Sequence, residues 1–364
     1  MWKWTLLGAL LGSALLGPAS AAQAIVGGEP APPGRWPWMA AVLDTSEQDA
    51  GWAQFCGGAV IAPRRVLTAA HCTRGETARS VDVLVGRTRL SQQDGQRIPV
   101  KAISVFPEYA SGRTPALDAA VLTLARDAGV PSLALARPGQ DALWGPGTLA
   151  WVMGWGKLNA RKSPGGSSYY ADRLRELQEP IQGDDACESV YGLGWWDLPY
   201  RPAWLFCSGT PGDRAGACSG DSGAPLVVGT PGAWLMVGMG VAGDSCASPG
   251  YFDLNVRVDQ VSGFALQAHL TARPEALSAP RVAGRLVAGA RVRCSRGRWR
   301  GDRAKFSVQW QQRGHVVGHR RHHRLHRRDV NARIRCLVTA RNRGGRVTVA
   351  SPSVRLRPVT RRIR

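Results

Sequence analysis

The 364-residue chain has no internal stretch of about 20 apolar residues, the length a membrane-spanning helix needs. We therefore expect no integral membrane association. It also has no Cys-x-x-Cys pair, and its eight cysteines form an even set, which favours disulfides over a metal site. Long helical periodicity and internal repeats are missing too, and short apolar runs between turn residues predict an all-β fold.

Acidic residues are scarce in the last quarter of the chain. Residues 273–364 hold 26 Lys and Arg against three acidic residues, a net charge of +23. Residues 1–272 hold 21 Lys and Arg against 23 acidic residues, a net charge of −2. A nearly neutral body thus precedes a strongly basic tail, and the length of the chain suits two domains.

Residues 1–24 have the organisation of a secretory signal peptide. Lys3 supplies the positive charge, an apolar run covers 6–16, and Gly17-Pro18 interrupts it. Small-x-small cleavage sites follow at 19–21 and 22–24. The sequence predicts export to an oxidising compartment, with an uncleaved buried helix as the alternative.

The predicted body covers residues 25–270. Strands are predicted at 81–85, 119–124, 149–153 and 226–228, and apolar spacing over Val261–Ala272 predicts a closing helix. Residues 271–280 are predicted to be a linker. Alternating segments at 291–294, 306–310 and 334–338 predict a small second β domain over 281–358, before a basic tail at 359–364.

Four separated motifs bring together side chains suited to nucleophilic catalysis. Thr68-Ala-Ala-His71-Cys72 places a histidine beside a cysteine. Asp118 opens an apolar strand, where a carboxylate is costly to bury unless a group such as an imidazole N–H pairs with it. Gly220-Asp-Ser222-Gly-Ala-Pro carries a hydroxyl, and Ile25-Val-Gly-Gly follows the signal.

These motifs, in the order His, Asp, Ser, resemble those of chymotrypsin/trypsin-like serine endopeptidases over about residues 25–270. The resemblance implies two perpendicular antiparallel β-barrels with the site between them. It makes Ser222 the nucleophile, His71 the base and Asp118 its orienting carboxylate, with backbone N–H groups of Gly220 and Ser222 as the oxyanion hole. Proteins or peptides are the expected substrates, and no cofactor is expected.

The same resemblance gives Asp221 a role in maturation. A new α-ammonium group on Ile25 would pair with its carboxylate and order the pocket. Because Ala24 lies in a signal-peptidase-like site, we expect signal removal alone to free Ile25. The competing hypothesis is cleavage after Ala21 or Ala22, which leaves a short propeptide.

The resemblance also implies a set of disulfides in the body. One would clamp the His71 loop, one a surface loop, and one the walls of the specificity pocket: Cys56–Cys72, Cys187–Cys207 and Cys218–Cys246. The segment 85–96 lacks the clustered carboxylates of a calcium loop, so no structural calcium or other metal is expected.

The specificity pocket lacks an acidic residue where the resemblance places its floor, six residues before the nucleophile. That position is Gly216, followed by Ala217, with Gly243 and Gly250 as wall positions. The pattern predicts an open, uncharged pocket and an apolar or aromatic P1 residue rather than trypsin specificity. Asp244 at the rim is a candidate for attracting basic substrates, and a solvated loop aspartate is the alternative.

The basic tail resembles bacterial immunoglobulin-like repeats over residues 279–358. The spacing Cys294…Trp310…Cys336 implies a β-sandwich with an inter-sheet disulfide packed on tryptophan. Its alternating arginines predict a positive face for a polyanion such as nucleic acid, an acidic glycan or an anionic cell-wall polymer. A solubilising, high-GC codon effect without a ligand is the alternative.

Taken together, these patterns predict a secreted, monomeric serine endopeptidase whose basic domain binds polyanions or the cell surface. Two alternatives stay open. One is a catalytically inactive, protease-like binding protein that acts as an adhesin or antimicrobial. The other is an enzyme whose tail is a spacer. The intact His71, Asp118 and Ser222 favour an active enzyme.

Overall fold

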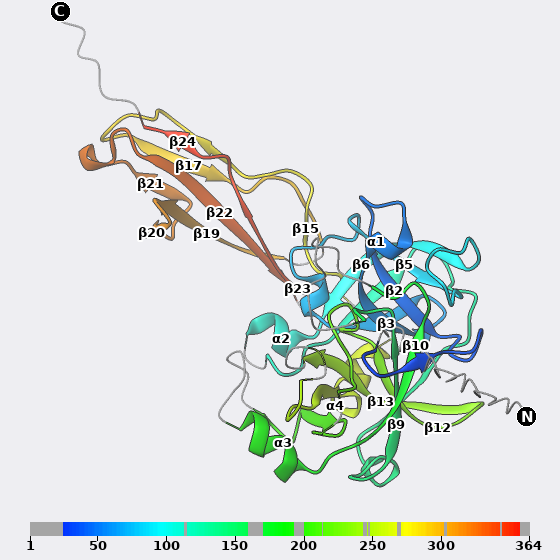
Figure 1. The fold of residues 1–364 in the computed structure, drawn as a ribbon. Helices are drawn as coiled ribbons and strands as arrows, with labels where there is room; N and C mark the ends of the chain where they lie inside the picture. Colours follow the sequence, from blue (N-terminus) through cyan, green and yellow to red (C-terminus); the bar gives the residue numbers. More distant parts are fainter. Residues whose placement is uncertain are drawn as a thin grey trace, which may run out of the picture.

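The computed structural model describes residues 25–356 except 113–114, 159–169, 193–199, 213, 243–245, 247, 268–270, 302–303 and 343. These residues form a β-rich body and a C-terminal β region, residues 271–356, which extends away from it (Figure 1). Helices are few and short, so the predicted all-β class is confirmed. None of the described helices has the length and apolarity needed to cross a membrane.

The first half of the body is a closed six-stranded barrel in the order β2-β3-β4-β7-β6-β5. Its strands are short, apolar and rich in valine and leucine, so their side chains fill a small barrel and closure leaves no free strand edge. The strands predicted at 81–85 and 119–124 lie here. The strand bounds are β2 Met39–Asp44, β3 Gln54–Ala62, β4 Arg65–Thr68, β5 Val81–Val85, β6 Gln96–Val105 and β7 Ala120–Leu124.

The second half is an eight-stranded sheet in the order β1-β10-β9-β12-β13-β14-β11, with β8 pairing in parallel with β13. It takes the place of the predicted second barrel, and the strands predicted at 149–153 and 226–228 belong to it. One buried apolar cluster draws residues from both halves, so the sheets share a core. The bounds are β1 Glu29–Pro30, β8 Ala134–Leu135, β9 Leu149–Gly154, β10 Arg175–Pro180, β11 Leu205–Ser208, β12 Pro225–Thr230, β13 Ala233–Ala242 and β14 Asp253–Arg257.

The closing helix α4, Val258–Ala265, begins three residues earlier than predicted and ends earlier. Val258 is buried and extends the apolar stripe backwards, whereas Leu266 at the C-cap is exposed. The prediction of a helix through residue 272 was therefore wrong. The other helices are α1 Ala50–Ala53, α2 Pro107–Ser111 and α3 Asp184–Tyr191, with 3-10 turns at His71–Thr73, Asp141–Leu143 and Arg327–Asp329.

The C-terminal β region contains a three-stranded sheet, β16-β17-β21, and a five-stranded sheet built on β20-β19-β22-β23 with β24 beside β22. The Cys294–Cys336 disulfide joins the two sheets, and Trp310 is fully buried in the same apolar cluster, as the spacing predicted. The likeness to immunoglobulin-like repeats stays a prediction. The bounds are β15 Glu275–Ala276, β16 Arg281–Ala283, β17 Arg291–Ser295, β18 Trp299–Arg300, β19 Lys305–Gln312, β20 His315–Gly318, β21 His322–Arg324, β22 Arg333–Asn342, β23 Gly345–Ala350 and β24 Val354–Arg355.

Candidate active site

His71 and Asp118 meet because their strands are neighbours in the first barrel. β4 pairs with β7, with Thr68 opposite Ala120, so the residues just outside the two strands lie side by side. Asp118 Oδ1 accepts the backbone N–H of His71 at 2.8 Å, and Oδ2 lies 2.6 Å from His71 Nδ1. A buried carboxylate on Nδ1 favours the tautomer with a proton there, which leaves Nε2 as the basic nitrogen.

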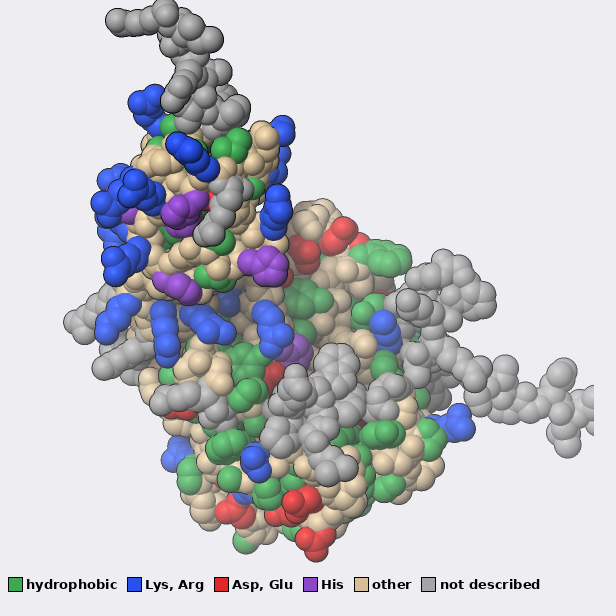
Figure 2. All heavy atoms as spheres, turned by 90° about the vertical axis from the view of Figure 1, so that its left-hand side faces the viewer, with side chains coloured by type: hydrophobic (Ala, Val, Ile, Leu, Met, Phe, Trp, Pro, Cys, Tyr) green, Lys and Arg blue, Asp and Glu red, His purple; other side chains and the backbone are tan. Residues whose placement is uncertain are grey.

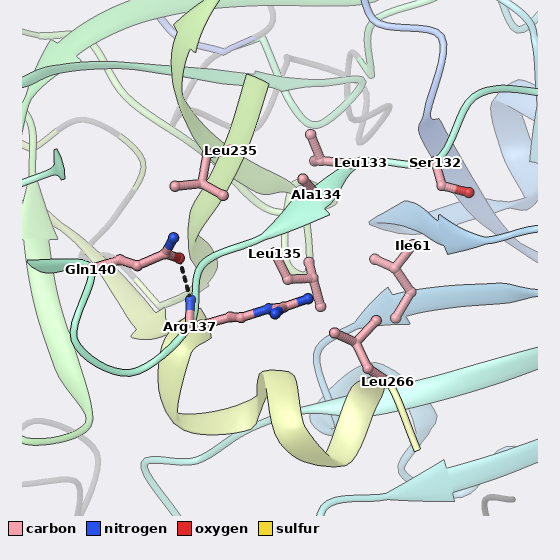
Figure 3. Close-up of a pocket in the computed structure, with 9 residues that line it drawn as sticks. All are labelled: Ile61, Ser132, Leu133, Ala134, Leu135, Arg137, Gln140, Leu235 and Leu266. Atoms are coloured by element: carbon pink, nitrogen blue, oxygen red, sulfur yellow. Dashed lines mark hydrogen bonds between the residues drawn. The ribbon is translucent and has the colours of Figure 1, made fainter. Parts of the chain in front are cut away.

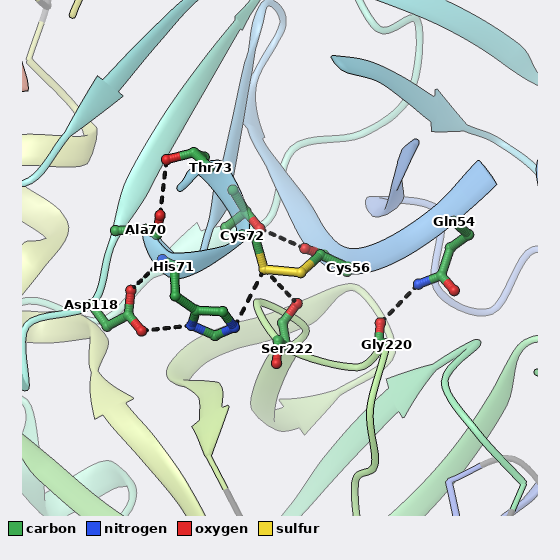
Figure 4. The surroundings of a disulfide bond; sticks show 11 residues. Gln54, Cys56, Ala70, His71, Cys72, Thr73, Asp118, Gly220 and Ser222 are labelled. Carbon is green, nitrogen blue, oxygen red and sulfur yellow. Dashed lines mark hydrogen bonds and ion pairs between the residues drawn. A yellow bond between two sulfur atoms is a disulfide. The ribbon is translucent and has the colours of Figure 1, made fainter. Parts of the chain in front are cut away.

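Ser222 lies in the turn before β12 and is fixed to the first barrel. Its carbonyl oxygen accepts the N–H of Gly57 on β3 at 2.9 Å. The Cys72 sulfur of the Cys56–Cys72 disulfide lies 3.6 Å from His71 Nε2 and 3.7 Å from the Ser222 carbonyl oxygen. Figure 4 shows Ser222 beside the Nε2 edge of the imidazole, away from Asp118. The structure thus brings the three predicted side chains together.

Two backbone N–H groups around Ser222 bond to no described residue and can bind an oxyanion. The N–H groups of Asp221, Gly223 and Ala224 each donate to a backbone carbonyl, at 2.9, 2.7 and 2.9 Å. In the described part of the chain those of Gly220 and Ser222 have no acceptor. The turn is held from outside by Gln54, whose Nε2 donates to the Gly220 carbonyl at 2.7 Å (Figure 4). Free N–H groups in a fixed turn are the donors an oxyanion hole needs.

Asp221 points away from Ser222 into the protein. It is 1% exposed, and its carboxylate accepts the N–H groups of Gly156 at 2.7 Å and Cys218 at 3.0 Å. A Cβ at Gly154 would lie 1.9 Å from one carboxylate oxygen, so only glycine leaves room there. Burial raises the pKa of Asp221 to about 7. No cation in the described ranges lies within ion-pairing distance of it.

The Ile25 segment lies against the floor of the predicted pocket. Ile25 is fully buried in an apolar cluster on which Ala217 packs, and Val26 forms a β-bridge with Gly216. The nitrogen of Ile25 is still in a peptide bond with Ala24 in this chain, so the predicted ion pair with Asp221 requires cleavage.

An aspartate that the sequence reasoning missed lies beside Gly216 and Ala217, the residues predicted to form the floor of an uncharged pocket. Asp253 Oδ2 accepts the N–H of Ala217 at 2.6 Å. A Cβ on Gly216 would lie 3.0 Å from the same oxygen, so this carboxylate borders the space that a side chain at 216 would take. The available signal was an aspartate at the start of an apolar strand, as for Asp118.

A second carboxyl group, that of Glu179 on β10, lies behind this floor and is 3% exposed. Burial raises the pKa of Glu179 to about 7, although the Ser208 hydroxyl acts in the opposite direction. Burial and then the charge of Glu179 raise the pKa of Asp253 well above its ordinary value. A cation entering the pocket would favour the ionised form of both groups.

The other residues predicted to line the pocket add little to its description. Gly243 and Asp244 lie outside the described residues. Gly250 lies in an exposed turn, where its N–H donates to the Pro211 carbonyl at 2.6 Å. The remaining predicted disulfides of the body, Cys187–Cys207 and Cys218–Cys246, are both present.

Two groups of described residues could be taken for metal sites, but in neither are the ligand atoms free to bind an ion. In the segment 85–96 the Arg87 guanidinium donates to the Asp94 carbonyl at 2.7 Å and the Leu90 carbonyl at 3.0 Å, taking oxygens that a calcium ion would need. Cys56, His71 and Cys72 lie close together, but the two sulfurs are bonded to each other and cannot act as thiolate ligands.

An apolar cavity of about 440 Å³ lies elsewhere, beside α4 and β8 (Figure 3). Leucine and isoleucine side chains line most of it, and Arg137 and Gln140 form its polar edge, where the Arg137 N–H donates to Gln140 Oε1 at 2.8 Å. It includes none of the residues placed around Ser222, so it is separate from the candidate active site.

An imidazole held by a buried carboxylate beside a serine in a glycine-rich turn defines the class of serine hydrolases. The trypsin family model matches residues 25–265, two thirds of the chain, and the chain belongs to the trypsin family of serine endopeptidases.

Several known relatives support this assignment. The chain is 36% identical over 234 residues to a trypsin of Saccharopolyspora erythraea, an alignment that covers 64% of this chain and 93% of that protein. It is 31% identical over 249 residues to a mouse tryptase, covering 66% and 87% of the two chains. It is 30% identical over 236 residues to mouse serine protease 28, covering 62% and 81%.

Proposed function

We propose that this peptidase is secreted and that Ser222, His71 and Asp118 are its catalytic residues. The observation that carries the assignment is the double contact of Asp118 with His71, at 2.8 Å to the backbone N–H and 2.6 Å to Nδ1. That contact fixes the imidazole in one orientation and one tautomer, with Nε2 directed to the Ser222 side (Figure 4).

The reaction then follows from the positions of these groups. Ser222 Oγ attacks the carbonyl carbon of the scissile bond while His71 Nε2 takes its proton. The N–H groups of Gly220 and Ser222 bind the oxyanion of the tetrahedral intermediate. His71 gives the proton to the leaving amine, which leaves an acyl-enzyme. Water then attacks the ester with His71 as base, and Ser222 regains its proton as the acid product leaves.

For the P1 residue we propose lysine or arginine. The apolar or aromatic preference expected from the sequence depended on an uncharged floor, and the carboxylate of Asp253 lies at that floor beside Gly216 and Ala217. A carboxylate that is partly removed from water is costly unless it is paired, so a basic P1 side chain gains a strong partner there. Profiling the cleavage sites in a peptide mixture tests this, and aromatic P1 residues would restore the uncharged-pocket hypothesis.

Maturation is expected to need only the removal of residues 1–24. The buried carboxylate of Asp221 needs a cation, and an α-ammonium group on Ile25 would supply one. Intact-mass measurement of the secreted protein should find Ile25 at the N-terminus together with full activity. A form that keeps Ala24 should be nearly inactive. An inactive secreted protein that begins at Ala22 or Gln23 would contradict this and favour a separate propeptide step.

We also propose that residues 281–358 form an immunoglobulin-like domain that binds a polyanion. Like charges face each other across its strands: Arg291 is opposite Arg324, and Arg341 is opposite both Lys305 and Arg346. Such pairs destabilise a sheet unless an anion lies over them. Figure 2 shows Lys and Arg side chains gathered over this region, whereas most Asp and Glu side chains in that view lie on the body.

This domain should retain the protein on heparin or DNA resin with a steep salt dependence. Replacing Arg291, Arg293 and Arg324 with glutamine should lower the elution salt and flatten the slope of log K against log salt by about one unit per lost phosphate contact. The matched control removes three exposed arginines of the body, Arg126, Arg137 and Arg201. Equal losses in both triple variants would mean that only net charge matters, which supports the spacer alternative.

A further inference from the structure

The first residues of the linker after the body are bonded to the first barrel. The Thr271 carbonyl accepts the Ser104 hydroxyl at 3.1 Å, and the N–H of Arg273 donates to the Ile103 carbonyl at 2.8 Å. The turn between β22 and β23 binds the end of the same strand, because the Gly344 carbonyl accepts the N–H of Val105 at 3.0 Å. Figure 1 shows β15 and β23 beside the barrel at this end of β6.

The turn and the linker also fit closely against each other. The Asn342 side-chain amide donates to the Ala272 carbonyl at 2.8 Å. A Cβ on Gly344 would lie 1.8 Å from the Thr271 carbonyl oxygen, so any other residue would push the turn away. Glu275 adds ion pairs to Arg79 of the body at 3.5 Å and to Arg300 of the C-terminal β region at 3.1 Å. The C-terminal β region is therefore docked on the barrel through several independent contacts.

The side chain of Arg273 reaches the loop that follows His71. Its guanidinium donates to the Thr73 carbonyl at 2.8 Å and also to the Glu76 carbonyl. Thr73 is the last residue of the 3-10 turn that begins at His71. The last carbonyls of such a turn lack partners within it, and a cation is the side chain that best satisfies them. Arg273 thus closes the far end of the His71 turn.

The segment that leads to Asp118 contacts both the C-terminal β region and the residue after the His71–Thr73 turn. The helix α2, which leads toward Asp118, packs against β23. Arg74, next in sequence to the His71–Thr73 turn, donates to the Tyr109 hydroxyl of α2 at 2.8 Å. The loop of His71 and the segment before Asp118 are thereby linked to each other and to the C-terminal β region.

We propose that the C-terminal β region is a fixed part of the catalytic unit, with Arg273 as a positioning residue that holds the His71 loop against Asp118. The inference rests on the proposed catalytic role of His71. Arg273 touches no reacting atom, so it acts on the rate through the orientation of the imidazole and leaves substrate binding unchanged.

The test uses the full-length mature protein with Arg273→Ala and Arg273→Lys. The alanine variant should lower kcat about tenfold or more, with KM within about twofold, since two loop carbonyls lose a charged donor. Its rate of labelling by a fluorophosphonate should fall by a similar factor as kcat. The final yield of labelled Ser222 should equal that of the unsubstituted protein, called the parent below. The lysine variant should restore part of both rates, because an ammonium group keeps one donor and the charge.

Two further variants separate positioning from general destabilisation. Gly344→Ala keeps Arg273 but disturbs the docking, and it should lower kcat in the same direction. Arg298→Ala removes an exposed arginine of the same region and should leave kcat unchanged. Thermal unfolding of each variant fixes an assay temperature at which all are folded.

The outcomes distinguish this inference from the proposed function. If the parent is labelled at Ser222 and Arg273→Ala keeps the parent kcat and labelling rate, the positioning role is wrong and the catalytic assignment stands. If the parent itself is not labelled at Ser222, the catalytic assignment is wrong, and the positioning role of Arg273 is wrong with it.

Discussion

Replacing Ser222 with alanine should lower kcat of the mature enzyme by about 10⁶-fold, because no other described group can form the acyl-enzyme at this site. The surrounding turn keeps its backbone hydrogen bonds, including Gly57 N–H to the residue 222 carbonyl, so folding and KM should change little. Steady-state kinetics on a peptide ester and a peptide amide would measure the loss. Ser219→Ala, an exposed serine three residues away, is the matched control and should stay within about threefold of the parent.

The companion substitution Asp118→Asn should lower kcat about 10⁴-fold. Its amide nitrogen would face Nδ1 and favour the tautomer with the proton on Nε2, where His71 can no longer act as base. Because the triad acts as a unit, the double variant with Ser222→Ala should be no worse than Ser222→Ala alone. Additive losses would mean that Asp118 supports the fold rather than the chemistry.

Replacing Asp253 with asparagine should lower kcat/KM for an arginine P1 substrate by about 10³-fold, because the guanidinium would be desolvated without a partner. The same change should leave kcat/KM for a phenylalanine P1 substrate unchanged or raise it. Asparagine Oδ1 can still accept the N–H of Ala217, so the floor keeps its shape. Asp127→Asn, whose side chain is 69% exposed on the body, is the charge-matched control.

The pH dependence of the preference for arginine over phenylalanine at P1 tests directly whether the carboxyl groups at the pocket floor are ionised. The raised pKa values of Asp253 and Glu179, the latter about 7, keep the floor partly protonated in acid. The ratio of kcat/KM for arginine to phenylalanine P1 substrates should therefore rise between about pH 5 and about pH 9. Both substrates are cleaved by the same proposed catalytic residues, so pH effects on the chemical step cancel in the ratio.

Substituting Glu179 with glutamine removes the neighbouring charge that raises the pKa of Asp253. The rise in the ratio should then move to lower pH. A ratio that favours phenylalanine at every pH would contradict the acidic floor and restore the uncharged pocket expected from Gly216 and Ala217.

The three proposed catalytic residues could be picked out from sequence because each lies in a local motif whose residue types have a chemical reason to be there. His71 beside Cys72, Asp118 at the start of an apolar strand and Ser222 in the sequence Gly220-Asp-Ser-Gly are visible without tertiary structure. Three disulfides followed from the resemblance to serine endopeptidases and the fourth, Cys294–Cys336, from the likeness of the tail to immunoglobulin-like repeats, and all four are present.

Asp253 and Arg273 were missed for a common physical reason. Asp253 is 31 positions beyond Ser222, and its place beside Gly216 depends on the folded sheet, in which β14 pairs with both β11 and β13. Arg273 lies in a polar linker, where an arginine is expected to be solvated, and its hydrogen bonds to the His71 loop depend on how the two regions dock. Spacing along the chain carries no information on either contact. The early start of α4 has a local signal in the apolar side chain of Val258, which continues the spacing of the helix toward its N-terminus.

Labelling of the secreted protein with a fluorophosphonate, mapped by peptide mass spectrometry beside the Ser222→Ala variant, tests the central claim most directly. We expect one adduct, on Ser222, which is absent from the variant and forms only in chains that begin at Ile25. No adduct on a protein whose N-terminus is confirmed as Ile25 would contradict the claim. The inactive, protease-like binding protein would then be the better account of this chain.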